Sequence, residues 1–145
     1  MRYIDVTIPI SQDMPVYEGD PPVEVVPFSS IEKGEAANIL RLGISTHTGT
    51  HVDAPLHFLQ NGRSVCEIPL EALIGPALVI DAGNIDVITA DLLASLHLGG
   101  IRRILFKTRN STYWKQQNFR KDFVHLSPEA GEFLVKQGVR LVGID

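Results

Sequence analysis

The sequence predicts an α/β domain whose front half is mainly β. Two patterns support this: short β-branched runs separated by turns before residue 60, and alternating strand and helix patterns after residue 76. The 145 residues are 44% hydrophobic and 21% charged, which are ordinary values for a globular chain that can bury a core. We therefore expect a single domain over residues 1–145.

Three strands and a stiff loop are expected in the front half. The β-branched run at residues 3–10 predicts a first strand. Residues 14–22 contain three prolines and a glycine, which predicts a loop of restricted flexibility. Residues 23–28 and 39–46 predict two further strands, and the second leads directly into a group of histidines.

The second half predicts strands joined by helices. Short apolar runs at residues 77–81 and 101–107 flank a helix predicted at residues 89–97. Ser127 is typical of a helix N-cap because a proline and a glutamate follow it. Helical crossovers favour parallel pairing. Residues 139–144 predict a buried final strand, and because no covering element follows it, we expect this chain to be a fragment of a longer protein.

The composition argues against several classes of function. The net charge of −4 and the pI of about 5.7 argue against a nucleic-acid binder, which needs a basic face. The single cysteine, Cys66, excludes an intramolecular disulfide and a cysteine zinc cluster. We find neither the apolar run of a signal peptide nor a membrane-length apolar stretch, so we expect no membrane partner and a cytoplasmic location.

Four polar groups alternate along the segment that follows the third predicted strand. His47, His51, Asp53 and His57 all lie at odd positions, and most of the even-numbered residues between them suit a packed face. In an extended chain, alternate residues share a face, so these groups would point into one cleft. A single histidine here would more often be structural, but four polar groups in register favour a functional site.

A straight strand cannot complete such a site. It would place His47 and His51 roughly 13 Å apart, whereas metal–nitrogen bonds are only ~2 Å long. We expect the backbone to bend at Gly49, because glycine tolerates dihedral angles that other residues avoid. Pro55 would then turn the chain so that His57 comes back toward the site.

The ligand types favour a catalytic metal site. Two imidazoles and a carboxylate suit zinc, with manganese or iron as alternatives. Three protein ligands leave a coordination position open for water, as in catalytic rather than structural zinc sites. The water bound there would be converted to a hydroxide nucleophile near neutral pH.

The run His-Thr-Gly-Thr-His-Val-Asp-Ala-Pro-Leu-His-Phe at residues 47–58 resembles the His-x-Gly-Thr-His-x-Asp-x-Pro-x-His-Phe signature of the cyclase family. That family includes bacterial kynurenine formamidases and isatin hydrolases. Residues 15–21 resemble the family's front loop, and residues 126–145 resemble its later helix and strand. The resemblance implies a swivelling β/β/α fold with a mixed sheet and crossover helices, here truncated at the C-terminal end.

The resemblance also implies roles for individual residues. His47, His51 and Asp53 match metal ligands, and Asp53 would bridge the two ions where two are bound. His57 matches a histidine proposed to shuttle protons, and Tyr17 falls where kynurenine formamidases carry a substrate-contacting tryptophan. The family's remaining histidine and glutamate ligands have no match in this chain. One or two zinc ions, with manganese as an alternative, and a homodimer or larger assembly are implied.

We therefore expect a metal-dependent hydrolase of a small aryl or cyclic amide, in which metal-bound hydroxide attacks the carbonyl and His57 shuttles the proton. The alternative is a truncated, non-catalytic metal-binding or interaction subunit. His97 and His125 are interpreted as structural. Residues 109–115 fit either a loop over the site or a solvated connection. Ser45 lacks the surrounding glycines of a nucleophile elbow.

Overall fold

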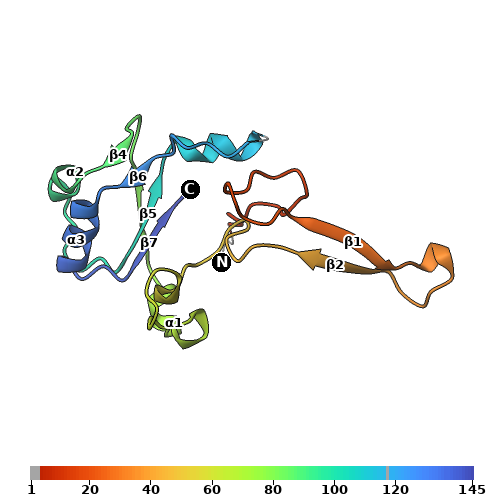
Figure 1. Ribbon diagram of the computed structural model, residues 1–145. Helices are drawn as coiled ribbons and strands as arrows, with labels where there is room; N and C mark the ends of the chain where they lie inside the picture. Colours follow the sequence, from red (N-terminus) through yellow and green to blue (C-terminus); the bar gives the residue numbers. More distant parts are fainter. Residues whose placement is uncertain (1–3, 117) are drawn as a thin grey trace. The chain divides into compact units, whose positions relative to one another are not determined.

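The computed structural model describes residues 4–116 and 118–145 and has a mixed α/β fold with several small sheets (Figure 1). The chain divides into two compact units. The first consists of Met1–Val65 with Lys115–Phe119, and the second consists of Cys66–Trp114 with Arg120–Asp145. This division does not test the expectation of one domain, which stays a prediction.

The first unit contains an antiparallel hairpin. Strands β1 (Glu24–Ser29) and β2 (Ile39–Gly43) pair in the register that places Glu24 opposite Gly43. A short 3₁₀ turn, η1 (Ile31–Lys33), lies in the connection between them. The predicted strands at residues 23–28 and 39–46 are thus confirmed, although β2 ends three residues early where the histidine segment begins to turn.

The prediction of a first strand at residues 3–10 is wrong for residues 4–10, which the structure describes. Residues 4–10 form no strand, and the Ile8 amide donates instead to the Thr50 hydroxyl at 3.0 Å. Ile4 and Val6 are 70% and 75% exposed. A β-branched sequence becomes a strand only when a neighbouring strand offers a ladder of hydrogen bonds, and no such neighbour lies beside these residues in the part of the chain that the structure describes.

The second unit is built on a three-stranded parallel sheet. Its order is β3 (Leu78–Asp81), β5 (Arg103–Lys107) and β7 (Leu141–Ile144), with β5 in the centre. The predicted parallel pairing is confirmed. Several short elements lie wholly or mainly in this unit, and their bounds are η3 Val65–Glu67, α1 Leu70–Leu73, β4 Val87–Ile88, α2 Ala90–Ala94, η4 Arg109–Lys115, β6 His125–Leu126 and α3 Pro128–Lys136.

The hydrophobic core lies between this sheet and two helices. Ile104 and Phe106 of β5 are buried against Leu93 of α2 and Leu134 of α3. Figure 1 shows α2 and α3 on the same side of the sheet. Full burial of each such side chain stabilises the fold by about 1.5–3 kcal/mol, so this layer dominates the stability of the second unit.

Side-chain caps fix where the two core helices begin. The Ser127 hydroxyl accepts from the Ala130 amide at 3.1 Å, and a proline follows at the first helical position, as predicted. The Thr89 hydroxyl accepts from the Leu92 amide at 3.3 Å. Helix α2 ends at Ala94, before the predicted end at residue 97, because the chain turns at Ser95.

The last predicted strand exists but is not buried. Strand β7 lies at an edge of the three-stranded sheet, where it has one neighbour. Val142 and Ile144 are consequently 41% and 43% exposed.

Among the described residues, the structure has no helix with the length and apolar character required to cross a bilayer.

Candidate metal centre

The loop between β2 and η2 (Pro55–His57) bends sharply at a glycine. The Thr48 amide donates to the Ser45 carbonyl at 3.1 Å, and Gly49 has a φ of +67°. A side chain is strained at this φ, which explains why glycine stands there. The bend brings the rings of His47 and His51 to a centroid separation of 5.1 Å, so the predicted turn at Gly49 is confirmed.

Three ligand atoms converge on the inside of this bend. His47 Nδ1 lies 3.2 Å from His51 Nε2 and 2.9 Å from Asp53 Oδ1, and His51 Nε2 lies 3.5 Å from the same carboxylate oxygen. The three side chains are 28%, 30% and 45% exposed, so a small solute can reach them. The structure thus brings together all three residues predicted as ligands.

The three ligand atoms cannot all be paired with one another by hydrogen bonds, because too few protons lie between them. His51 Nδ1 lies 2.7 Å from the Gly49 carbonyl, which can only accept, so the ring proton sits on Nδ1 and neutral His51 presents a lone pair at Nε2. That lone pair faces an acceptor oxygen of Asp53 and His47 Nδ1. His47 Nδ1 can supply at most one proton to two acceptors. A cation between the three atoms would be bound by one lone pair from each of them.

The spacing of the three atoms also fits a divalent ion. Ligand atoms on tetrahedral bonds of ~2.0–2.1 Å stand about 3.3 Å apart, which is close to the observed separations. A histidine ligand usually donates its other ring N–H to a carbonyl or carboxylate, as His51 does to Gly49. The geometry and the donor set therefore fit a metal ion bound by His47, His51 and Asp53.

His57 lies beside this cluster but outside it. Pro55 begins the 3₁₀ turn η2, which carries the His57 ring to within 4.1 Å of the His47 ring, centroid to centroid. His57 also contacts the ring of Phe58 at 4.1 Å. The expected return of His57 toward the cluster is observed. The expected packed face is wrong at Val52, Leu56 and Phe58, which are 43%, 49% and 84% exposed, because the segment turns and forms no strand.

Tyr17 lies in the front loop and is accessible. Its side chain is 59% exposed, and its ring contacts that of Phe119 edge-on at 5.2 Å. The Tyr17 carbonyl accepts from the Asp20 amide at 3.0 Å, which closes a turn that contains Gly19 at a φ of +98°. An exposed aromatic ring on a closed turn suits contact with an aromatic ligand.

Sequence reasoning missed two hydrogen-bonding roles. The Ser45 hydroxyl, considered only as a nucleophile, bonds to Asp20 and to the His47 amide. The buried side chain of Asn110 donates to the Val124 carbonyl at 2.9 Å and accepts from the Val124 amide at 2.8 Å. The Ser45–Asp20 and Asn110–Val124 bonds join residues 25 and 14 positions apart, and no local sequence pattern signals them.

The remaining predicted residues belong to the second unit, apart from Lys115. His97 and His125 belong to the second unit and are both exposed. Residues 109–115 form the 3₁₀ helix η4, in which Arg109 pairs with Asp86 at 2.5 Å and bonds the Tyr113 hydroxyl at 3.1 Å. These contacts of Arg109 hold η4 to the segment that contains Asp86.

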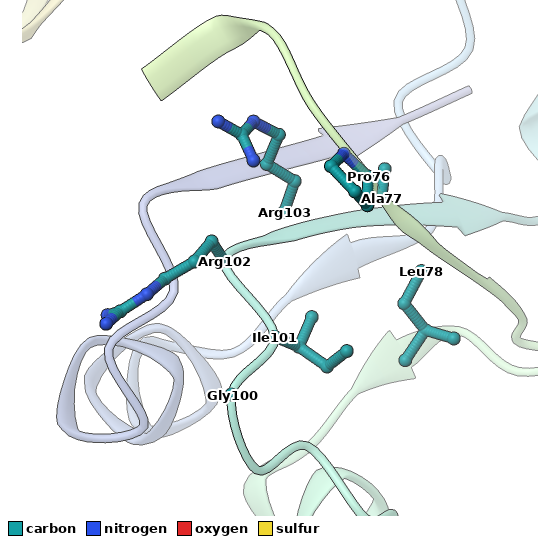
Figure 2. Close-up of a pocket in the computed structure, with 7 residues that line it drawn as sticks. All are labelled: Pro76, Ala77, Leu78, Gly100, Ile101, Arg102 and Arg103. Carbon is teal, nitrogen blue, oxygen red and sulfur yellow. The ribbon is translucent and has the colours of Figure 1, made fainter. Parts of the chain in front are cut away.

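A separate pocket of about 260 Å³ opens beside the start of β5 (Figure 2). Figure 2 shows Leu78 and Ile101 facing one another across it, while the guanidinium groups of Arg102 and Arg103 extend away from them. Arg102 donates to the Gly138 carbonyl, and Arg103 donates to carbonyls of α1. The arginines are thus engaged in structural bonds, and the pocket contains none of the predicted site residues.

Comparison with known proteins gives consistent matches along the chain. The family described as "Putative cyclase" matches residues 4–145. The kynurenine formamidase of Bacillus cereus (strain ATCC 14579) is 35% identical over 144 residues, which cover 99% of this chain and 68% of that protein. The kynurenine formamidase of Bacillus anthracis is 34% identical with the same coverage.

Two solved structures are similar in fold and sequence. One is described as a potential metal-dependent hydrolase with cyclase activity and matches with a TM-score of 0.79 at 36% identity. The other, a predicted metal-dependent hydrolase from Bacillus stearothermophilus, matches with a TM-score of 0.77 at 35% identity. The matches cover 98% of this chain but 66% and 67% of those chains, so the sequence spans about two thirds of the length of its relatives.

Proposed function

Since the chain belongs to the cyclase family, we propose that it carries metal ligands of a hydrolase that acts on a small aryl or cyclic amide, such as an N-formyl aryl amine. The convergence of His47 Nδ1, His51 Nε2 and Asp53 Oδ1 on one point carries this proposal. The names of the relatives, kynurenine formamidase and metal-dependent hydrolase, support the reaction class.

The proposed chemistry divides between the ion and the residues of the chain. A divalent ion bound here would supply Lewis acidity and would make water a better nucleophile near neutral pH. His47 and His51 would offer neutral ring nitrogens as ligands, and the Gly49 carbonyl would hold the proton of His51 on Nδ1. Binding of the ion by these residues needs no movement of the loop, because the ligand atoms are already close together.

His57 and Tyr17 would act on the substrate. His57 lies beside His47 without sharing the ligand cluster, so its ring can accept a proton from the attacking water and release it to the leaving nitrogen. The exposed Tyr17 ring would contact the aryl group. Zinc is the proposed ion because two imidazoles and one carboxylate suit it, with manganese as the alternative. A homodimer or larger homo-oligomer and a cytoplasmic location belong to the same proposal.

Metal binding by a ligand variant tests the proposal. We expect the parent chain to bind Zn²⁺ in competition with a chromophoric chelator, and His51→Ala to weaken that binding by more than about 100-fold. Replacing even an outer hydrogen-bond partner of a ligand costs 10–100-fold, and His51 is placed to contact the ion directly. His97→Ala, which removes an exposed histidine of the other unit, is the matched control and should bind as the parent does.

Equal Zn²⁺ affinity in His51→Ala and the parent, at equal folding by circular dichroism, would contradict the metal site. Turnover of an N-formyl aryl amine by the metal-loaded chain then separates the two functional alternatives. Hydrolysis supports the enzyme, whereas tight binding of Zn²⁺ without hydrolysis, in a protein that spans the full length of the matched relatives, supports a non-catalytic metal-binding subunit of the same family.

A further inference from the structure

A short chain of hydrogen bonds joins the front loop to the backbone of the metal loop. The Ser45 hydroxyl donates to Asp20 Oδ2 at 3.0 Å and accepts from the His47 amide at 3.2 Å. The direction of these bonds is fixed, because a backbone N–H can only donate and a carboxylate can only accept. The hydroxyl proton therefore points to Asp20, and an oxygen lone pair points to His47.

Asp20 also belongs to the turn that carries Tyr17. Its amide closes that turn by donating to the Tyr17 carbonyl at 3.0 Å. One residue thus bonds through its backbone to the loop with the exposed aromatic ring and through its side chain to the loop with the ligands. Asp20 and Ser45 are both partly buried, which strengthens the bond to a charged acceptor relative to an exposed one.

We propose that Asp20 is a positioning residue: acting through the Ser45 hydroxyl, it holds the His47 backbone where the Nδ1 atom meets His51 and Asp53. The inference rests on the proposed metal site and deepens it. Asp20 touches neither a ligand atom nor the substrate in this role. A carboxylate acceptor makes the Ser45 hydroxyl a better acceptor in turn, because hydrogen bonds in a chain polarise one another.

A double-mutant cycle with Zn²⁺ affinity as the readout tests the inference. Asp20→Ala and Ser45→Ala are each expected to weaken Zn²⁺ binding by about 10–100-fold, the usual cost of losing an outer partner of a ligand. The double variant should lose no more than either single variant, because both substitutions break the same chain of bonds. Ser45→Thr keeps the hydroxyl and should recover most of the affinity.

Removing the charge of Asp20 would also weaken cation binding by a purely electrostatic route. That effect would persist in the Ser45→Ala background, so additive losses in the double variant would overturn the inference. Asp13→Ala is the matched control, because it removes an exposed carboxylate of the same unit and the same net charge. It is expected to leave Zn²⁺ affinity close to that of the parent.

A second readout does not depend on metal. Hydrogen exchange of the His47 amide should accelerate in both Ser45→Ala and Asp20→Ala, and it should stay slow in Asp13→Ala and Ser45→Thr. Unchanged exchange at His47 in Asp20→Ala would overturn the inference even if the metal site is real. A parent chain that fails to bind Zn²⁺ would contradict the proposed function itself, and the two failures are therefore distinguishable.

Discussion

The hydrogen bond from His51 Nδ1 to the Gly49 carbonyl determines which ring nitrogen is free to bind. Residue types and spacing could predict the ligand candidates, because imidazole and carboxylate groups have well-defined metal chemistry. They could also predict the bend, because glycine tolerates the φ of +67° observed at Gly49 far more readily than residues with a side chain. The tautomer of His51 depends on a backbone contact and could not be read from the sequence.

Thr48 shows another limit at the residue scale. It was expected on a packed face, and it is 8% exposed. Its hydroxyl oxygen is buried without a hydrogen-bond partner in the part of the chain that the structure describes. A buried hydroxyl left unpaired costs about 1–3 kcal/mol, so this polar group opposes the packing of the loop, and the alternation of residues along the sequence does not reveal that cost.

His57→Ala tests the separation of proton transfer from metal binding. We expect the variant to keep the Zn²⁺ affinity of the parent, because the His57 ring lies beside His47 and outside the ligand cluster. Where the metal-loaded parent hydrolyses an N-formyl aryl amine, the rate of hydrolysis by the variant should be lower by about 10²–10⁴-fold, the usual contribution of a general acid or base. Loss of metal together with activity would make His57 a ligand and refute its proposed role.

At the scale of elements, local signals predicted the second unit well. The Ser127 cap, the apolar runs of β3 and β5 and the parallel order all follow from patterns within each segment. The small sheet of β4 (Val87–Ile88) and β6 (His125–Leu126) was missed, because two-residue strands carry no periodicity. Strand pairing between distant segments is decided by tertiary contacts, which also explains why residues 4–10 are not a strand.

The hairpin and the central strand should differ in hydrogen exchange. An isolated two-stranded hairpin is marginally stable in water, and Phe28 and Leu40 on β1 and β2 are 76% and 60% exposed. Strand β5 pairs on both sides and contributes Ile104 and Phe106 to the core. We therefore expect amides of β1 and β2 to exchange at least ~100-fold faster than those of β5 in dilute protein, measured by NMR or mass spectrometry.

Equal protection in the two elements at low protein concentration would contradict this expectation. Protection of β1 and β2 that increases with concentration would instead show that another copy covers the hairpin. Protection of β5 provides the internal control, because its hydrogen bonds lie within the second unit.

At the scale of the whole molecule, the two units carry different properties. The buried core cluster lies in the second unit, and the His47, His51 and Asp53 cluster lies in the first. Composition predicted a chain with enough apolar residues for a core, but it could not predict that the core would occupy one unit. The distribution follows from the β3–β5–β7 sheet and its two helices, which offer the layered packing that the hairpin lacks.

Exposed ion pairs in the second unit predict how stability responds to acid. Hydrogen bonds from Arg120 lower the pKa of Asp122 from 3.8 to about 2, and a hydrogen bond from Lys107 lowers the pKa of Asp81. A carboxylate with a lowered pKa stabilises the folded state above its unfolded value and loses that effect as the pH falls through the folded value. We expect the contribution of the Arg120–Asp122 pair to be complete above about pH 4 and to decline between pH 4 and pH 2, and the contribution of the Lys107–Asp81 pair to decline as the pH falls below the unfolded pKa of 3.8.

Carbon-13 NMR of the Asp122 carboxyl group measures this directly. Its midpoint should lie at about 2 in the parent and move back toward 3.8 in Arg120→Gln. Lys136→Gln removes a similar charge from an exposed pair on α3 and should leave that midpoint unchanged. A normal midpoint in the folded parent would show that the Arg120–Asp122 pair does not persist in solution.

All three proposed ligands lie within a segment of seven residues, 47–53, and the bend at Gly49 brings their ligand atoms together. Closing so short a segment costs little chain entropy, so the unfolded chain keeps part of the same binding capacity. A ligand that binds both states stabilises the folded state by less than its affinity for that state alone would give. Under the proposed metal role, added Zn²⁺ would therefore raise the melting temperature of this protein less than its folded-state affinity implies.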